Sequence, residues 1–80
     1  MTKEEVLKVI SKNIVENLDD MEGQEIDPQK SMKEYGANSL DMIEVVSTSM
    51  RELQIKIPRT ELADIKNIDE LADKFMEYVE

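Results

Sequence analysis

Three stretches of the chain repeat apolar residues at the spacing of an α-helix. In the first stretch, residues 3–18, large apolar side chains recur every four residues, at Val6, Ile10, Ile14 and Leu18. Side chains spaced by three or four residues share one helix face, so this pattern predicts a helix with a single buried stripe. Thr2 is suited to the N-cap, and Glu5 three residues later would complete a capping box. A chain with this pattern is expected to fold by packing helices together.

The second and last helical stretches begin with the same kind of signal. Residues 39–53 follow Asn38, a good N-cap, and Asp41 lies in the first turn, where the helix dipole favours a carboxylate. The residues predicted to face the core of this helix are Leu40, Ile43, Val46, Met50 and Leu53. The last helix is predicted to begin after Asn67, and its buried stripe comprises Ile68, Leu71, Ala72, Phe75 and Val79.

Two connections of different length separate these helices. Residues 19–38 have no periodicity and contain both glycines, with isolated apolar residues at Ile26, Met32 and Tyr35. This predicts a long loop that touches the core at intervals and includes a short turn of helix at most. Loops of this length are uncommon in compact domains and are often functional. Residues 54–57 predict an extended connection that buries Ile57 before Pro58 ends it, and Thr60 is predicted to cap a short third helix.

The length of 80 residues allows one small domain, which we expect to span residues 1–80. The predicted fold class is all-α, a small four-helix bundle with a long loop between the first and second helices and a short third helix. No apolar run approaches the roughly 20 residues of a membrane span, and the N-terminus has acids where a secretory signal needs basic and apolar residues. A soluble, cytoplasmic monomer is expected.

The composition excludes several classes of functional site. The chain has no Cys and no His, so it cannot form a disulfide, a Cys/His metal site or a nucleophile–histidine couple. Ten Lys and Arg against nineteen Asp and Glu give a net charge of −9, which would repel nucleic acids and anionic lipids and attract basic protein surfaces. We therefore predict a protein without catalytic residues that binds other proteins rather than nucleic acid or membrane.

The acidic segment 19–27 was compared with the calcium-binding loop of an EF-hand. If Gly23 takes the sixth position of that loop, Leu18 falls at the first position and Gln29 at the twelfth. Both positions should supply carboxylate oxygens. The match fails at the ligands, so a solvated loop is the better interpretation and no metal site is predicted.

Ser39 is the residue that the sequence singles out. A serine at a helix start is usually a cap or first-turn residue. Here the long loop would make its hydroxyl accessible, and the free N–H groups of a helix N-terminus would favour a phosphate attached there. On the same helix, Met42 and Val45 extend the apolar face beyond the core stripe. Either they widen the buried face or they form an exposed docking patch beside Asp41 and Glu44.

The sequence around Ser39 resembles a known motif. The segment Tyr35-Gly36-Ala37-Asn38-Ser39-Leu40-Asp41-Met42-Ile43-Glu44 is similar to the phosphopantetheine attachment motif of acyl carrier proteins, usually Leu-Gly-Ala/Val-Asp-Ser-Leu. The similarity extends over nearly the whole chain and includes Ile57-Pro58 before the short third helix. It implies that a phosphopantetheinyl transferase attaches phosphopantetheine from coenzyme A to Ser39, and that the thiol of this arm holds an acyl group as a thioester.

The resemblance also implies a partner surface on the second helix. The residues predicted to contact partner enzymes are Asn38, Leu40, Asp41, Met42, Ile43, Glu44, Val45 and Arg51. Two departures from fatty-acid carriers favour dedicated partners. Asn38 replaces the usual Asp, and Arg51 introduces a positive charge where those carriers present a negative one. Gly36-Ala37 also differs from the Gly-Gly of peptidyl carriers.

The sequence of residues 35–46, followed by Ser49-Met50-Arg51-Glu52-Leu53, looks like that of the discrete donor carriers of polyketide β-branching cassettes, such as the donor carrier of the curacin pathway. This resemblance implies an acyltransferase that supplies malonyl and a ketosynthase-like enzyme that decarboxylates it to acetyl. An HMG-CoA-synthase-like enzyme would then condense the acetyl with a β-ketone. The alternatives are a general fatty-acid or other acyl carrier, and a non-covalent acidic docking module that uses Asp41, Glu44 and Glu52. A calcium-responsive protein using residues 19–27 has the least support.

Overall fold

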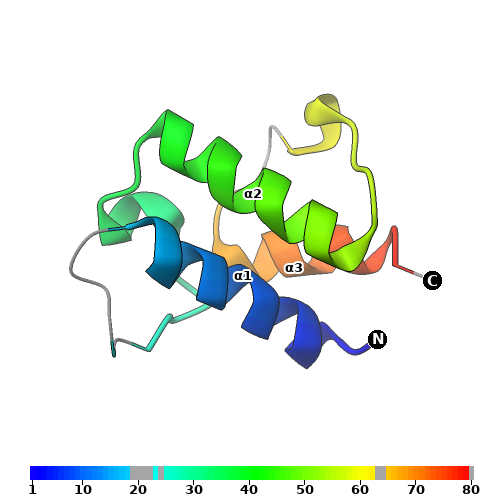
Figure 1. Ribbon diagram of the computed structural model, residues 1–80, viewed down its shortest axis with the longest axis horizontal. Helices are drawn as coiled ribbons and strands as arrows, with labels where there is room; N and C mark the ends of the chain where they lie inside the picture. The colour runs from blue at the N-terminus through cyan, green and yellow to red at the C-terminus, as the bar shows by residue number, and fades with distance from the viewer. Residues whose placement is uncertain (19–22, 24, 63–64, 80) are drawn as a thin grey trace.

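A computed structural model describes residues 1–18, 23, 25–62 and 65–79. Three α-helices span Lys3–Asn17 (α1), Ser39–Leu53 (α2) and Ile68–Met76 (α3). Two short 3₁₀ helices, η1 at Met32–Tyr35 and η2 at Arg59–Leu62, lie in the connections, and these described ranges contain no β-strand. Figure 1 shows α1 and α2 running in opposite directions across the front of the molecule, with α3 behind them.

The all-α prediction is confirmed, but the count of four helices is not. The short third helix is the 3₁₀ helix η2 in the described chain, and Thr60 lies inside this element rather than before it. The preceding connection buries Ile57 as predicted, but Gln54, expected to be extended, is the left-handed C-cap of α2. A four-residue element makes too few i→i+4 hydrogen bonds to be stable as an α-helix, and the tighter 3₁₀ turn is common in such connectors.

The predicted helix starts are confirmed at all three α-helices. The side chain of Thr2 accepts a hydrogen bond from the Glu5 backbone N–H, and that of Asn67 accepts one from Glu70. Asn38 accepts from the Asp41 N–H at 2.8 Å, while the Asp41 carboxylate accepts from the Asn38 N–H at 3.1 Å. These bonds satisfy N–H groups that have no partner inside the helix, so each side chain fixes the residue at which its helix begins.

The core lies where the three α-helices meet. Its fully or almost fully buried apolar residues are Val6, Ile10, Ile14, Met32, Ala37, Val45, Ile57, Ile68, Leu71, Ala72 and Phe75. The predicted stripe of α1 is buried through Ile14, and Leu18 becomes the partly buried C-cap. The stripe of α3 is buried through Phe75, and Val79 lies beyond the helix end.

The predicted stripe of α2 is only partly right: Val46, Met50 and Leu53 pack partly buried against the core. Leu40 and Ile43, expected in the core, are 76% and 49% exposed. The buried residues of this helix are instead Val45 and Ser49. The buried face of α2 is therefore rotated toward α1 relative to the predicted stripe. The prediction failed at Leu40 and Ile43 because α2 has more apolar residues than one helix face can hold.

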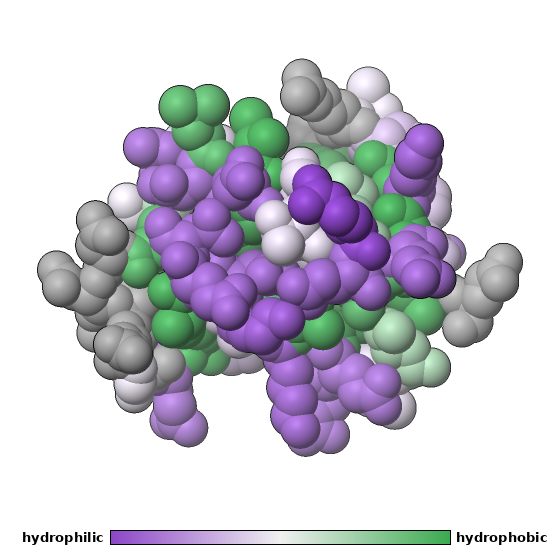
Figure 2. Space-filling view, in the orientation of Figure 1, coloured by the Kyte–Doolittle hydropathy of each residue, from purple (hydrophilic) through white to green (hydrophobic). Residues whose placement is uncertain are grey.

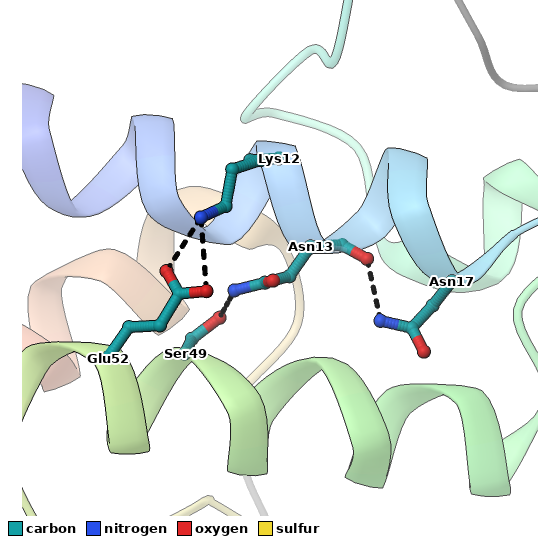
Figure 3. Close-up of polar contacts among 5 residues, drawn as sticks. All are labelled: Lys12, Asn13, Asn17, Ser49 and Glu52. Carbon is teal, nitrogen blue, oxygen red and sulfur yellow. Dashed lines mark hydrogen bonds and ion pairs between the residues drawn. The ribbon is translucent and has the colours of Figure 1, made fainter.

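Ser49 is buried because it has a polar partner on α1. Asn13 is also fully buried, and its Nδ2 donates to the Ser49 Oγ at 2.9 Å (Figure 3). At the edge of the same interface the Lys12 ammonium lies 3.0 Å from the Glu52 carboxylate. Sequence periodicity missed this polar contact, since it counts only apolar residues as candidates for the core.

The long connection is attached to the core as predicted. Met32 is buried, and Ile26 and Tyr35 pack partly buried against the core. The Tyr35 hydroxyl accepts a hydrogen bond from the Asp27 N–H at 2.7 Å. The backbone carbonyls of Pro28 and Lys30 accept from the first N–H groups of α3. The part of the loop that precedes α2 is thus fixed to both the core and α3.

Candidate functional site

The start of α2 is positioned by the four residues before it. Gly36 has φ 89°, a left-handed conformation that ends η1 and that residues with a side chain rarely adopt. Ala37 is then buried, and its N–H donates to the Met32 carbonyl at 3.2 Å. Asn38 closes the reciprocal cap with Asp41. This sequence of turn, buried anchor and cap places the first residue of α2 at a defined point on the surface.

Ser39 is that first residue, and its side chain is exposed. Among the described residues, no hydrogen bond engages its hydroxyl, because the capping function is performed by Asn38. The N–H groups of the first helical turn and the positive end of the helix dipole lie beside it. An exposed hydroxyl at this place is accessible to a modifying enzyme, and the helix end favours a phosphate attached to it.

The predicted partner residues differ in their exposure. Five of them are exposed: Asn38, Leu40, Ile43, Glu44 and Arg51. Asn38 and Asp41 hold the helix cap, so their polar groups already serve the helix itself. Figure 2 shows hydrophobic groups projecting at the upper left, over the N-terminal end of α2, beside a largely hydrophilic front face.

Met42 and Val45, whose position the sequence left open, take different places. Val45 is fully buried in the core, so its inclusion among the partner-contacting residues was wrong. Its side chain has no surface that a partner could reach while α2 packs against α1. Met42 is half-buried and lines a groove of about 710 Å³ beside α2.

The groove lies between α2, η1 and residues 57, 62, 65–68 and 71. Met42, Ile43 and Val46 line it from α2, and its other apolar lining residues include Met32, Ile65 and Leu71. Ser39 is not among the lining residues. The apolar residues of α2 that are not in the core therefore line the groove or are exposed to solvent.

No described group of acidic residues has the geometry of a metal site. Most of the acidic segment considered as an EF-hand, residues 19–22 and 24, lies outside the described residues. None of the helices in the described ranges is long and apolar enough to cross a membrane.

A comparison with protein families shows which family this chain belongs to. The family model described as the phosphopantetheine attachment site matches residues 12–75. The chain belongs to this family of acyl carriers. Its cofactor is a covalently attached phosphopantetheine, as the sequence around Ser39 predicted.

Two acyl carriers are similar to this chain over almost their whole length. It is 36% identical over 80 residues to the polyketide biosynthesis acyl-carrier-protein AcpK of Bacillus subtilis (strain 168), covering all of this chain and 98% of that protein. It also matches a chain in the crystal structure of the curacin biosynthetic pathway HMG synthase in complex with acetyl donor-ACP. That match has a TM-score of 0.86 and 43% identity, and covers 94% of this chain and 96% of the other.

The sequence prediction of an acyl carrier similar to those of polyketide pathways is therefore confirmed. Ser47, which the sequence did not single out, lies between Glu44 and Arg51 on the side of α2 opposite Val45 and Ser49. It is half-buried and lines the groove.

Proposed function

We propose that Ser39 bears the phosphopantetheine arm and that residues 1–80 act as one monomeric donor carrier domain in polyketide β-branching. The observation that carries the proposal is the exposed Ser39 hydroxyl at the first residue of α2, within the segment that resembles the attachment motif. The arm would supply the thiol that holds an acyl group as a thioester, which this Cys-free chain cannot do itself.

The residues around Ser39 hold and present the attachment point. Ala37 anchors the chain in the core, and the Asn38–Asp41 cap fixes the end of the helix. The first N–H groups of α2 would stabilise the negative phosphodiester. None of these groups takes part in bond making, so the chemistry would belong to the partner enzymes.

The donor role is supported by likeness to a chain crystallised with an HMG synthase, at 43% identity. In this role an acyltransferase loads malonyl, a ketosynthase-like enzyme decarboxylates it, and an HMG-CoA-synthase-like enzyme receives the acetyl group. These enzymes and the phosphopantetheinyl transferase would dock on α2 through Leu40, Ile43, Glu44 and Arg51, with Met42 reached through the groove. Weak, fast contacts suit a carrier that meets several enzymes in turn.

Intact mass spectrometry tests the attachment site. The parent chain, Ser39→Ala and Ser11→Ala are incubated with coenzyme A, magnesium and a broad-specificity phosphopantetheinyl transferase. We expect one phosphopantetheine on the parent and on Ser11→Ala, which removes a hydroxyl from α1, and none on Ser39→Ala. Equal loading of Ser39→Ala would refute the site.

The donor role needs a separate test against the alternative of a general fatty-acid carrier. The acetyl-loaded chain is offered to the curacin-pathway HMG synthase and, in parallel, to fatty-acid condensing enzymes. The donor role predicts that the HMG synthase consumes the acetyl thioester faster than the fatty-acid enzymes do. The opposite preference would leave an acyl carrier but reject the donor role.

A further inference from the structure

The helix α2 has two faces that could pack against α1. The face used in the structure is centred on Val45 and Ser49, which are both fully buried. A second face, which we call the groove face, comprises Met42, Val46 and Met50; these residues are half-buried and line the groove. Val46 and Met50 each follow a residue of the buried face by one position, so turning the helix by about 100° would bring the groove face against α1.

Apolar burial alone favours the face that the structure does not use. The groove face consists of three large apolar side chains, whereas the fully buried positions of α2 hold one valine and one serine. Because burial of apolar surface is favourable in proportion to its area, hydrophobicity would place the groove face against α1. A different interaction must therefore select the observed packing.

The observed packing satisfies a buried polar group that the turned packing would leave unpaired. Asn13 is fully buried on α1, and its Nδ2 donates to the Ser49 Oγ at 2.9 Å, with the two side chains pointing toward one another in Figure 3. The Asn13 Oδ1 already has no hydrogen-bond partner among the described residues. Turning Val46 and Met50 toward α1 would leave the whole amide unpaired in the core, which disfavours that packing about tenfold or more.

The choice of packing also determines where Ser39 points. Ser39 precedes Val46 by seven residues, which is close to two helical turns, so it lies at the head of the groove face. In the turned packing Ser39 would face α1 instead of solvent. Val45 would then take the exposed place that Glu44 now holds.

We propose that Asn13 and Ser49 are positioning residues for Ser39: their hydrogen bond selects the face of α2 that packs on α1 and so keeps Ser39 on the accessible side. The inference rests on the proposed attachment of phosphopantetheine to Ser39. It gives the buried contact a role other than stability. An apolar pair could stabilise the interface as well as this polar pair does, but it would not distinguish the two packings.

Cysteine accessibility tests the proposal, because the chain has no cysteine of its own. Val45→Cys and Val6→Cys are matched reporters: both valines are fully buried, but Val6 lies on α1 and keeps its place in either packing. Each is labelled with a thiol reagent, before the arm is attached, in the parent and in Asn13→Leu with Ser49→Ala. In this double variant the labelling of Val45→Cys should accelerate about tenfold more than that of Val6→Cys, because the turned packing becomes populated.

Two outcomes of the labelling would overturn the proposal. Equal accelerations of the two reporters would show a general loosening of the core rather than a turn of α2. A double variant without helical structure by circular dichroism would also overturn it, since the proposal requires the apolar interface to form without the polar contact.

Exchanging two neighbouring residues of α2 tests the selection in the opposite direction. Ser49→Met with Met50→Ser keeps the composition, but only the turned packing then offers Asn13 a hydroxyl. In the parent, Val46→Cys should label faster than Val45→Cys, because Val46 is half-buried and Val45 is fully buried. The exchanged chain should reverse this order. An exchanged chain that is folded and keeps the order of the parent would overturn the proposal; if it does not fold, the double variant decides.

The rate at which Ser39 is loaded connects the packing with the function. A phosphopantetheinyl transferase should load the double variant about threefold more slowly than the parent, because only part of its population presents Ser39. Lys12→Gln changes the exposed edge of the same interface and should load like the parent. Equal loading of all three chains would overturn the positioning role. If the parent itself takes up no arm at Ser39, the proposed attachment fails, while the cysteine rates still decide which residues select the packing.

Discussion

The helices α1 and α2 are of equal length, 15 residues each, yet they distribute their apolar side chains in opposite ways. The main stripe of α1, from Val6 to Ile14, is completely buried. By contrast, α2 exposes Leu40 and Ile43 while it buries a serine. A helix that serves only the fold can bury its apolar residues, whereas one that also meets partners keeps some of them outside. The difference indicates that stability and recognition are assigned to separate faces of α2.

Matched isoleucines on the two helices give the largest expected contrast. Ile10→Ala removes a fully buried side chain from α1 and should lower the free energy of unfolding by about 2–5 kcal/mol. Ile43→Ala removes a side chain that is already 49% exposed and should cost less than about 1 kcal/mol. Urea denaturation of the two variants measures both values. Similar losses would mean that the two helices do not differ as described.

The polar contact between the helices should give the next largest effect. Ser49→Ala removes the acceptor of the Asn13 amide, whose buried Oδ1 already has no hydrogen-bond partner among the described residues. Leaving the whole amide unpaired in the core should cost about 1–3 kcal/mol. The double variant Asn13→Leu with Ser49→Ala replaces both polar groups by apolar ones and should recover most of that loss. A double variant less stable than Ser49→Ala would show that the contact contributes more than the satisfaction of its own groups.

The sequence was sufficient to predict the buried faces of α1 and α3, but not that of α2. For α1 and α3 the spacing of apolar residues identified the buried stripe, since each helix has one apolar face. For α2 the same rule chose Leu40 and Ile43, because spacing does not tell an apolar residue kept for the core from one kept for a partner. The Asn13–Ser49 contact joins residues 36 positions apart and depends on how the helices pack. No local sequence pattern predicts this contact.

The place of the proposed attachment residue, Ser39, was more predictable than the surface around it. Ser39 could be singled out because caps, dipole and loop are local properties of residues 36–41, and the motif adds further specificity. The partner surface depends on which side of α2 remains free. This is why Val45, which is fully buried, was wrongly included. The sequence did not show that η2 is a 3₁₀ helix, because a short segment gives too little periodicity to tell a 3₁₀ turn from an α-turn.

The cap of α2 offers a smaller test of the region that presents Ser39. Asn38→Ala loses the bond to the Asp41 N–H and should destabilise the protein by about 1 kcal/mol. Asn38→Asp restores the residue usual in the family and should retain the stability, because a carboxylate also accepts this bond. Thermal unfolding of both variants measures the effect. A loss in Asn38→Asp equal to that in Asn38→Ala would contradict the role of the cap.

The smallest effect is expected at the exposed edge of the α1–α2 interface. The hydrogen bond from the Lys12 ammonium to Glu52 raises the pKa of Lys12 above its ordinary value of 10.5. Since the pKa is higher in the folded state, the stabilisation is complete below pH 10.5 and is lost as the pH rises through the folded-state pKa. When the pH is raised through this range, the melting temperature of Lys12→Gln should therefore fall less than that of the parent. Identical alkaline losses would show that the pair contributes nothing measurable.

The division of α2 into a core face and a partner face is tested most directly by nuclear magnetic resonance. The ¹⁵N-labelled chain with phosphopantetheine attached is titrated with the curacin-pathway HMG synthase while each backbone amide is followed. We predict that the largest changes appear from Ser39 to Arg51, at the start and along the exposed side of α2, and that amides around Lys8 on α1 remain unaffected. Changes centred on α1, with the exposed side of α2 undisturbed, would contradict this division of α2.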